Sequence, residues 1–389
     1  MMSKETYLKR LKTALQQQGQ VKGAELGEVL AFFEELWEDR LENGQSEAAI
    51  WADLGEPEAA AGQITAEVAS QTPQPGPDPE PSGTKWAEAA SDQQESGQTF
   101  SSGQEQPQSY DKTFAATCCR QVVLETFNQQ IEVGPSEDGR IHLTFTVNKW
   151  TTYKLLLRDE FLFLRRLKKE PSGGLAWLWP LRFQESLAPL MLRLPTTVVY
   201  SLLTKTRNGG SRVEGVRLHK LDLRDQNAAL RLTGLEPETL DARSSNGGIS
   251  LEQSQIRQGL SLQSSNAGIS CAQVDAGWLE MTSSNGRLTC SQVQLKQQAA
   301  LITSNAAIQL TDLRADKLDC QSSNGGIKVE GLAVKHIRLV TSNANIRGTI
   351  RGKAADYYQG MPETAAAESA PYLYTQTSNG RVSLDFAGE

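Results

Sequence analysis

Carboxylates recur at one fixed place in the C-terminal half of the chain, where pairs of them could serve as acid and base. They stand five residues before a series of asparagines, at Asp222, Asp241, Glu280 and Asp319. Hydrolysis of a glycosidic bond needs two carboxyl groups about 5–10 Å apart, one with a raised pKa. Two of these repeats carry an arginine two residues further on, so we expect the carboxylates to pair with cations on an exposed sheet instead.

The other side chains that commonly catalyse reactions are not grouped. The three histidines, His142, His219 and His336, have no acid and nucleophile at a spacing that indicates a hydrolytic triad. The sequence has no Gly-Lys-Ser/Thr loop for phosphate and no dinucleotide fingerprint. No repeat offers adjacent acids and a third ligand for Ca²⁺. We therefore predict no catalytic residue, no metal site and no cofactor, in a protein that is not an enzyme.

The cysteines and the apolar runs bear on location. Cys271 and Cys290 fall at the same apolar position one repeat apart, which indicates small core residues, with a disulfide or a metal site as the alternative. The start of the sequence lacks the apolar core of a secretory signal, and no apolar run approaches 18 residues. These features favour a reducing, cytoplasmic location; membrane association and the extracellular surface are the alternatives.

A repeated sequence motif must position these side chains. Two of its copies are Ser-Ser-Asn-Gly-Gly-Ile-Ser-Leu at 244–251 and Ser-Ser-Asn-Ala-Gly-Ile-Ser-Cys at 264–271. The asparagines lie 19 or 20 residues apart in the clear central copies, and weaker copies extend the series. A fixed period of this size is typical of a solenoid. The asparagines are Asn208, Asn227, Asn246, Asn266, Asn285, Asn305, Asn324, Asn343 and Asn379.

Apolar and polar residues alternate on both sides of each asparagine, as at Leu260 and Leu262 before Asn266 and at Ile269 after it. A third apolar position, Val274 in this copy, follows eight residues after the asparagine. Alternation with a period of two predicts short, half-buried strands. Three inward faces predict a mainly β protein with a three-faced parallel β-helix of about 19 residues per coil, its coils roughly 4.8 Å apart. A coil of twice that length is the alternative.

The asparagines are predicted to form a structural ladder. Asparagine tolerates a left-handed turn, and its amide can bond the amides above and below it. The next residue is Gly or Ala in every copy, as a crowded corner requires. Gly and Ala alternate from copy to copy, so we infer a unit of two coils that was duplicated.

Residues 1–70 are predicted to form a small all-α domain. Leu8, Leu11 and Leu15 recur at helical spacing, and Gly55 ends a short helix. The longest helix carries an acidic outer face that is either solvated or a docking surface for a basic partner. The acids of this candidate partner face are Glu34, Glu35, Glu38 and Asp39.

The middle of the chain is predicted to change from linker to sheet. Residues 71–112 hold alternating prolines and a Gln/Ser-rich remainder with too little apolar surface to fold, which indicates a disordered linker. Residues 113–200 show strand patterns and are predicted to form a cap and entry strands, and residues 201–389 the repeat domain. An aromatic lid is expected over the open end of the β-helix. The lid residues are Trp177, Trp179 and Phe183.

One coil is interrupted by extra residues. Asn343 and Asn379 are 36 residues apart, so residues 353–370 are predicted to leave the stack. Insertions from a solenoid often line a binding face. Tyr357, Tyr358 and Met361 are therefore a candidate binding loop, and a plain surface loop is the alternative.

The helical segment resembles the HAAS signalling domain in features that occur in order. They are the run from Tyr7 to Leu15, the acidic aromatic helix from Phe32 to Asp39, and Leu54-Gly55-Glu56-Pro57. Members of that family are often joined to membrane spans and encoded near PadR-type regulators. The resemblance implies a protein partner, either a regulator or a membrane-associated signalling protein, although this sequence shows no transmembrane segment.

Residues 115–389 are similar to the bacterial putative-adhesin β-strand-repeat family. The likeness is carried by the Ser/Thr-Ser-Asn-Gly-x-Ile-x-Leu copies and by the Leu192-Arg193-Leu194-Pro195 entry to the first coil. It implies a right-handed β-helix with no activity common to the family. A helical module joined to these repeats is similar to Gram-positive cell-envelope stress proteins.

Charge and these resemblances together define the expected function. The net charge is −7, and no concentrated basic face indicates a nucleic-acid partner. We expect a non-enzymatic bacterial scaffold or signalling protein that acts through protein–protein contacts in cell-envelope stress sensing. The alternatives are a surface adhesin that binds glycan or protein, with a cell-wall ligand, and a glycan-active β-helix enzyme.

Overall fold

A computed structural model describes most of the chain. The described residues are 3–18, 26, 29–30, 33–34, 37, 41, 46–62, 97–102, 107–148, 151–158, 160–167, 188–360 and 370–387. They fall into two compact units, residues 1–95 with 169–186, and residues 96–168 with 187–389. Each unit has its own buried core.

The smaller unit contains the helices α1 (Lys4–Gln18) and α3 (Glu47–Leu54), and residues 57–62 are also helical. Gly55, with a φ of 72°, donates its N–H to the carbonyl of Trp51 and ends α3. Aromatic side chains form the centre of the core, where the rings of Tyr7 and Trp51 meet edge to face with centroids 4.9 Å apart. The prediction of helices in this segment is confirmed for the described residues.

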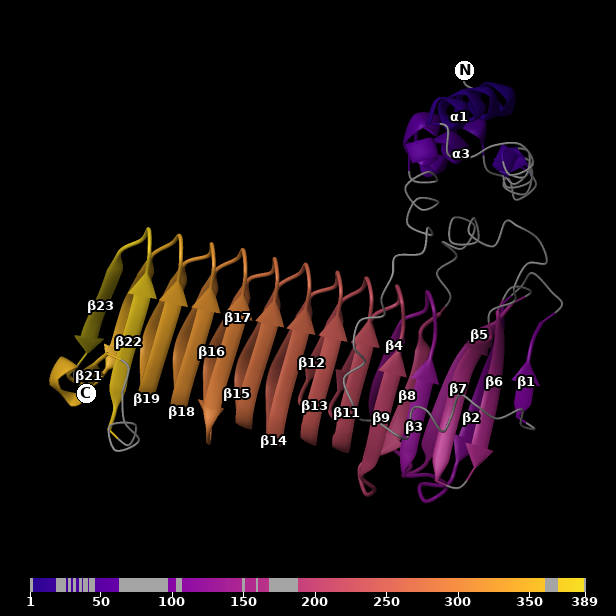
Figure 1. The fold of residues 1–389 in the computed structure, drawn as a ribbon. Coiled ribbons are helices and arrows are strands. Elements are labelled where there is room, and N and C mark those ends of the chain that lie inside the picture. The colour runs from indigo at the N-terminus through magenta and orange to yellow at the C-terminus, as the bar shows by residue number, and fades with distance from the viewer. Residues whose placement is uncertain are drawn as a thin grey trace. The chain divides into compact units, whose positions relative to one another are not determined.

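The larger unit is a β-solenoid of about 8 turns, with about 19 residues per turn (Figure 1). Its coils are built from β9 (Tyr200–Lys205), β10 (Ser211–Glu214), β11 (Arg217–Asp225), β12 (Leu230–Thr233), β13 (Glu236–Ser244), β14 (Ile249–Ser264), β15 (Ile269–Ser283), β16 (Leu288–Leu295), β17 (Gln298–Thr303), β18 (Ile308–Ser322), β19 (Ile327–Thr341), β20 (Ile346–Arg351), β22 (Tyr372–Thr377) and β23 (Val382–Ala387). Neighbouring coils pair in parallel throughout.

The pairing register shows three faces in each coil. β14 pairs with β15 in three runs, residues 249–252 with 269–272, 254–256 with 274–276, and 259–264 with 278–283. Ile269 pairs in turn with Leu288, one coil further on. The coil therefore takes 19 or 20 residues, and the alternative coil of twice that length is wrong.

The core of the solenoid is a set of apolar rows that run from coil to coil. Ile249, Ile269, Leu288 and Ile308 form one such row, and each is at most 2% exposed. Burial of a side chain of this size is worth about 1.5–3 kcal/mol. Because every coil repeats the same inward positions, the rows fix the register of the stack.

Two strands pair in parallel with the first coil, and antiparallel strands lie beyond them. β3 (Gln121–Glu125) and β4 (Ile131–Ser136) lie in the first coil, and β8 (Leu190–Pro195) pairs with β4 in parallel. β7 (Phe161–Leu167) pairs antiparallel with β6 (Thr152–Arg158), and β6 pairs antiparallel with β1 (Gln98–Phe100). β8 continues antiparallel through β5 (Ile141–Val147) to β2 (Gln108–Phe114).

This cap corrects one predicted boundary. β1 and most of β2 fall within residues 71–112, which were predicted to be a disordered linker. Phe100 is buried and its ring meets that of Phe145 at 5.2 Å, so this stretch supplies apolar anchors that its overall polar composition hides. The predicted lid residues Trp177, Trp179 and Phe183 lie outside the described residues.

The interrupted coil is at the C-terminal end. Ile346 pairs with Val382, 36 residues on, so β20 is followed by the insert and the stack resumes at β22 and β23. The insert carries the 3₁₀ turn η2 (Ala354–Asp356) and the short strand β21 (Tyr358–Gln359), which pairs in parallel with β22.

Candidate functional site

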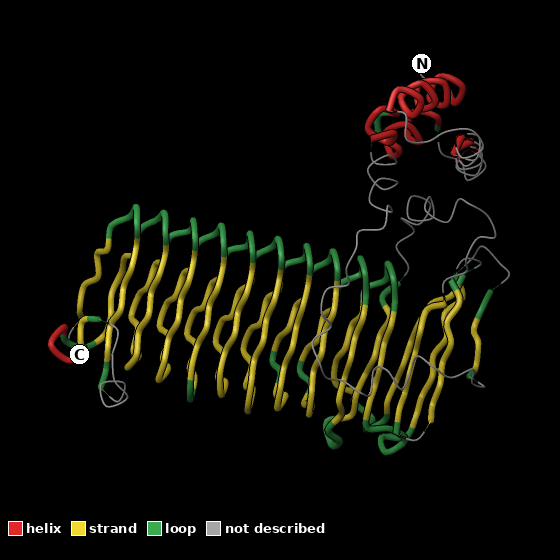
Figure 2. The backbone as a smooth tube through the Cα atoms, viewed as in Figure 1, coloured by secondary structure: helices red, strands yellow, loops and turns green. Residues whose placement is uncertain are grey.

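The asparagine side chains lie on the outside of a corner that recurs in every coil. The Nδ2 group of each donates to the Oδ1 atom of the asparagine one coil before it, over 2.6–2.8 Å. The bonded series also includes Asn128, which accepts from Asn208. All of these side chains between Asn208 and Asn379 are exposed. Figure 2 shows the corners as a row of loops along one edge of the solenoid.

A second, buried row of hydroxyl groups, which was not among the predicted features, lies under the asparagines. Ser264 Oγ accepts a bond from the N–H of Ala267 in its own coil and donates to the carbonyl of Gly247 in the coil before, over 3.2 Å each. Thr303 and Thr341 donate to the previous coil in the same way. The signal was present, because each clear copy begins with Ser or Thr two residues before the asparagine.

The alternation of Gly and Ala after the asparagines has a steric cause. A Cβ atom on Gly247 would lie 1.8 Å from the carbonyl oxygen of Ala228, and one on Gly286 would lie 1.8 Å from that of Ala267. Gly325 is similarly placed against Ala306. Every second coil therefore needs glycine where its backbone passes closest to the coil before it.

A second corner lies seven residues after the asparagine, and its backbone is left-handed. Glycine occupies it at Gly215, Gly234 and Gly331, with φ between 61° and 66°. In the four coils between Gly234 and Gly331 the position carries a side chain, and φ is between 50° and 56°. Those residues are Gln253, Gln273, Gln292 and Asp312. A left-handed conformation costs a residue with a side chain about 1–2 kcal/mol.

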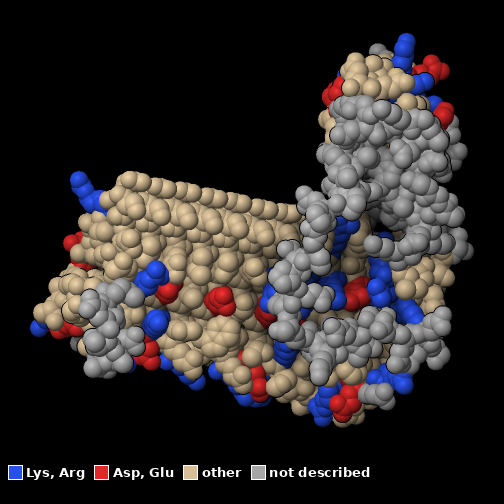
Figure 3. Space-filling view, in the orientation of Figure 1, with Lys and Arg blue, Asp and Glu red and all other residues tan. Residues whose placement is uncertain are grey.

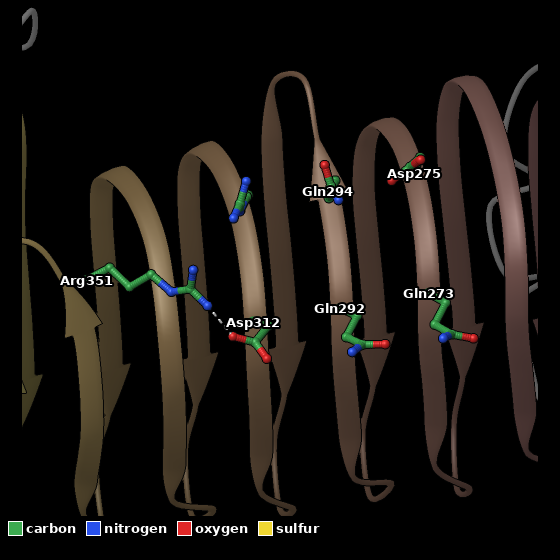
Figure 4. Close-up of a pocket in the computed structure, with 7 residues that line it drawn as sticks. Gln273, Asp275, Gln292, Gln294, Asp312 and Arg351 are labelled. Atoms are coloured by element: carbon green, nitrogen blue, oxygen red, sulfur yellow. Dashed lines mark hydrogen bonds and ion pairs between the residues drawn. The ribbon is translucent and has the colours of Figure 1, made fainter. Parts of the chain in front are cut away.

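Three of these side chains, those of Gln273, Gln292 and Asp312, border a polar groove of ≈ 470 Å³ on the outer surface of the solenoid. Figure 4 shows two rows of side chains that face the groove: Gln273, Gln292 and Asp312 from the second corner, and Asp275 and Gln294 from the adjoining face. The register adds Arg314 to the second row, because it pairs with Gln294. We call the seven lining residues the polar groove: Gln273, Asp275, Gln292, Gln294, Asp312, Arg314 and Arg351.

An ion pair closes one end of the polar groove. Arg351 Nη2 lies 2.5 Å from Asp312 Oδ1, two coils away (Figure 4). The pair passes Gly331, where an added Cβ atom would lie 2.7 Å from the Asp312 oxygen. The glycine thus leaves the space that the bridge occupies. Both side chains are about half exposed, so the pair is worth about 0–1 kcal/mol.

Three of the four carboxylates that first suggested acid–base chemistry are paired with arginines, and one of the three, Asp222, is buried and not on an exposed surface as expected. Arg224 Nε lies 3.1 Å from Asp222, Arg243 Nη2 lies 2.8 Å from Asp241, and Arg338 Nη1 lies 2.7 Å from Asp319. On the face that Figure 3 displays, acidic and basic side chains are interspersed along the lower part of the solenoid. Glu280 is exposed.

Among the described residues, one carboxyl group has a raised pKa, and its role in the fold is structural. Burial raises the pKa of Asp225 above its usual value of 3.8, and backbone N–H groups oppose the shift. Its carboxylate accepts bonds from the N–H groups of Gly210 and Ala228. Asp225 thus occupies the buried position that Ser or Thr holds in the later coils, and it caps the same corner.

The cysteines are free thiols. Cys271 and Cys290 pair in register on neighbouring coils, and burial raises the pKa of both, that of Cys290 to about 12. Cys290 Sγ lies 3.4 Å from the sulfur of Met281. Among the described residues, no group of three or more His, Cys, Asp and Glu side chains could hold a metal ion.

The candidate binding loop is divided between the stack and the solvent. The hydroxyl of Tyr357 donates to the carbonyl of Val334 over 2.8 Å, and its ring lies 5.9 Å from that of Phe386. Tyr358 is 55% exposed, whereas Met361 lies outside the described residues. Tyr357 therefore holds the start of the insert against the preceding coil.

Only part of the candidate partner face can be placed. Glu34 is exposed and lies 3.2 Å from the ammonium group of Lys4 in α1. Glu35, Glu38 and Asp39 lie outside the described residues. Arg10, also in α1, bonds both Glu56 and Glu58, and this raises the pKa of Arg10 and lowers that of Glu58.

These features define the larger unit as a three-faced β-solenoid with an amide ladder on one corner. Comparison with protein families then places both units. Residues 6–63 match the family model of HAAS, and residues 223–358 match that of Toastrack DUF4097. The N-terminal segment is thus similar to HAAS domains, and the central part of the solenoid is similar to Toastrack domains.

Several solved structures resemble the solenoid at low sequence identity. A putative adhesin from Parabacteroides distasonis has 12% identity and a TM-score of 0.40, over 72% of this chain and 99% of that one. A putative lipid binding protein from the same species has 14% identity and a TM-score of 0.36, over 72% and 97%. A putative adhesin from Bacteroides fragilis has 15% identity and a TM-score of 0.30, over 72% and 99%. No curated protein matches the chain.

No helix in the described part of the chain is long and apolar enough to cross a membrane.

Proposed function

We propose that this chain is a non-enzymatic bacterial scaffold that senses cell-envelope stress through protein–protein contacts. In this proposal the HAAS domain binds a regulator or a membrane-associated signalling protein, and the solenoid is a rigid binding surface. The observation that carries it is the coupling of two modules with separate cores, one of them a stack whose corners are locked by repeated hydrogen bonds.

The use of the solenoid's charges supports a structural rather than a catalytic role. Asp241 and Asp319, which are partly exposed, and Asp222, which is buried, each lie beside an arginine, and such pairing of opposite charges stabilises a sheet. The carboxyl group with a raised pKa, Asp225, is tied to backbone N–H groups inside a corner. None of these acids has the freedom that a general acid needs to reach a substrate.

The acidic face of the HAAS domain is our candidate for the partner surface. Four acids would share one side of a helix that also carries the buried residues Phe33 and Trp37. Because such a helix packs its apolar side against the core, the acids on its opposite side face the solvent together. We propose that this face recognises a basic surface on the partner, and that the contact weakens with salt.

The test is capture of the partner by the intact chain, followed by its identification. The test variant neutralises the four acids: E34Q, E35Q, E38Q and D39N. The control variant neutralises four exposed acids of the solenoid: E236Q, E252Q, E280Q and D385N. We expect the first to lose the partner and the second to retain it, with less partner captured at high salt.

The two alternatives predict different results. A surface adhesin predicts that cell fractionation finds the chain outside the cell, whereas the scaffold proposal places it in the cytoplasm, where its free thiols stay reduced. A glycan-active enzyme predicts new reducing ends when the chain is incubated with cell-wall polysaccharides. Release of such ends would contradict the non-enzymatic proposal. Retention of the partner by both variants would move the partner contact away from the acidic face.

A further inference from the structure

We infer that the polar groove on the second corner is a binding site for an extended, neutral, hydroxyl-rich polysaccharide that lies across the coils. This inference rests on the proposed scaffold function and names the ligand of its solenoid module. The site is built from two rows of side chains in consecutive coils, from Gln273 and Asp275 at one end to the Arg351–Asp312 pair at the other (Figure 4).

The backbone conformation at the second corner indicates that the side chains there have a function. The solenoid meets the left-handed requirement of this corner with glycine at Gly215, Gly234 and Gly331. In four consecutive coils it instead places Gln253, Gln273, Gln292 and Asp312 there, against the steric preference of residues with a Cβ atom, and the last three line the groove. Unfavourable backbone conformations of this kind concentrate at functional sites.

The amide groups of this row are available to a ligand. In the asparagine ladder, Asn285 donates to Asn266 and accepts from Asn305, so its amide is used within the stack. Gln273 and Gln292 are exposed and make no side-chain hydrogen bond to another described residue. The two rows of amides on the solenoid thus differ. The asparagine amides bond one another, whereas the glutamine amides of the second corner face solvent.

Two of the four charged side chains of the groove, Asp275 and Arg314, are also available to a ligand, whereas Asp312 and Arg351 pair with each other. Asp275 and Arg314 lie in the groove without an ion pair among the described residues, whereas Asp319 and Arg338 on the neighbouring face lie 2.7 Å apart. A carboxylate accepts hydrogen bonds, a guanidinium donates them, and an amide does both. The groove therefore offers donors and acceptors side by side, with little net charge.

The lining residues select the class of ligand. All seven are polar or charged, and the groove offers no apolar side chain to the apolar centre that protein interfaces bury. A polymer whose every unit carries hydroxyl groups, each a donor and an acceptor, matches such a lining. The rows repeat once per coil, at about 4.8 Å, so an extended polymer of similar unit length would meet the same groups again at each step.

The experiment measures binding of defined hexasaccharides to the intact chain by titration calorimetry. The probes are cellohexaose and chitohexaose, which are extended, and maltohexaose, which is curved. A Ser/Thr-rich peptide of the same length is the polypeptide probe. The variants are Q273A/Q292A in the groove and Q263A/Q298A, which changes two exposed glutamines on another face.

We expect one of the extended hexasaccharides to bind, and Q273A/Q292A to weaken that binding about tenfold or more, since two hydrogen-bonding amides are lost. Q263A/Q298A should bind as the parent chain does. A third variant, Q273G/Q292G, should lose binding to the same degree and keep or raise the melting temperature, because glycine is unstrained at this corner. Loss of binding then cannot be assigned to unfolding.

Other results would overturn the inference. Equal affinity of the parent and Q273A/Q292A, or no binding of any hexasaccharide, would exclude the groove as a polysaccharide site. Binding of the peptide through the groove would assign it to a polypeptide partner instead. The partner contact of the HAAS acidic face is measured separately, so failure of the groove and failure of the scaffold proposal give different results.

Discussion

Asn285 donates a hydrogen bond from its Nδ2 group to Oδ1 of Asn266, one coil earlier, over 2.8 Å. Asn285 in turn accepts a bond from Asn305 over 2.7 Å. An asparagine inside the ladder therefore makes two such bonds, whereas Asn379 only donates, to Asn343. Hydrogen bonds in a chain polarise one another, so the inner bonds should be the stronger ones.

Position in the ladder should set the cost of removing an amide. We expect Asn285→Ala to lower the free energy of unfolding by about 1–3 kcal/mol, because two bonds of about 0.5–1.5 kcal/mol each are lost. Asn379→Ala should cost about half as much. Urea denaturation of both variants measures the difference. Equal costs at the two positions would mean that the exposed amides contribute through turn conformation rather than through their mutual bonds.

The Gly/Ala alternation gives a second prediction. Gly286→Ala places a methyl group 1.8 Å from the carbonyl oxygen of Ala267, a contact that only backbone movement can relieve. We expect a loss of about 2–4 kcal/mol, in the range of strained core substitutions. Gly248→Ala is the control, because its Cβ atom would lie 3.3 Å from the nearest backbone oxygen. Thermal unfolding should separate the two variants by several degrees.

The solenoid was predictable because its signals repeat. Apolar residues at fixed offsets from each asparagine, as at Ile269 and Leu288, define the inward rows, and the period defines the coil.

The linker boundary was wrong because composition was averaged over residues 71–112. Phe100 and Tyr110 pair with partners far along the chain, and no local pattern shows such pairing.

The polar groove could be found from sequence only in part. A polar residue seven places after the asparagine in four consecutive copies, at Gln253, Gln273, Gln292 and Asp312, is visible by simple alignment of the copies. Its left-handed backbone is not, since glycine marks that corner in some coils and is absent from others. The bridge from Arg351 to Asp312 spans two coils and depends on the gap at Gly331, which only the fold reveals.

Acid stability should depend on Asp225 with a definite sign. Its pKa in the folded chain is raised above 3.8, so the folded state binds the proton more tightly than the unfolded state does. The contribution of this group is fully present below pH 3.8 and is lost as the pH rises through the raised pKa. We expect the stability of the parent chain relative to Asp225→Ser to fall between pH 3.8 and 7, as measured by urea denaturation.

Asp138 provides a control of opposite sign. Bonds from His142, from the N–H of Arg140 and from Ser136 lower its pKa from 3.8 to about 2. Its contribution is present above pH 3.8 and is lost as the pH falls towards 2. The stability of the parent chain relative to Asp138→Asn should therefore decrease on acidification. A change in the same direction for Asp225→Ser and Asp138→Asn would contradict the assignment for Asp225.

The insert of the last coil separates a structural tyrosine from an exposed one. Tyr357→Phe removes the hydroxyl bond to the carbonyl of Val334 and leaves the ring contact with Phe386. We expect it to cost about 1–2 kcal/mol, because the carbonyl loses its partner. Tyr358→Phe should leave stability unchanged, since that side chain is 55% exposed.

The insert has both a structural and a binding role if Tyr357→Phe alone lowers stability and Tyr358→Ala alone weakens binding of a partner. An equal loss of stability for both hydroxyl deletions, measured by chemical denaturation, would instead show that the exposed ring also holds the insert to the stack.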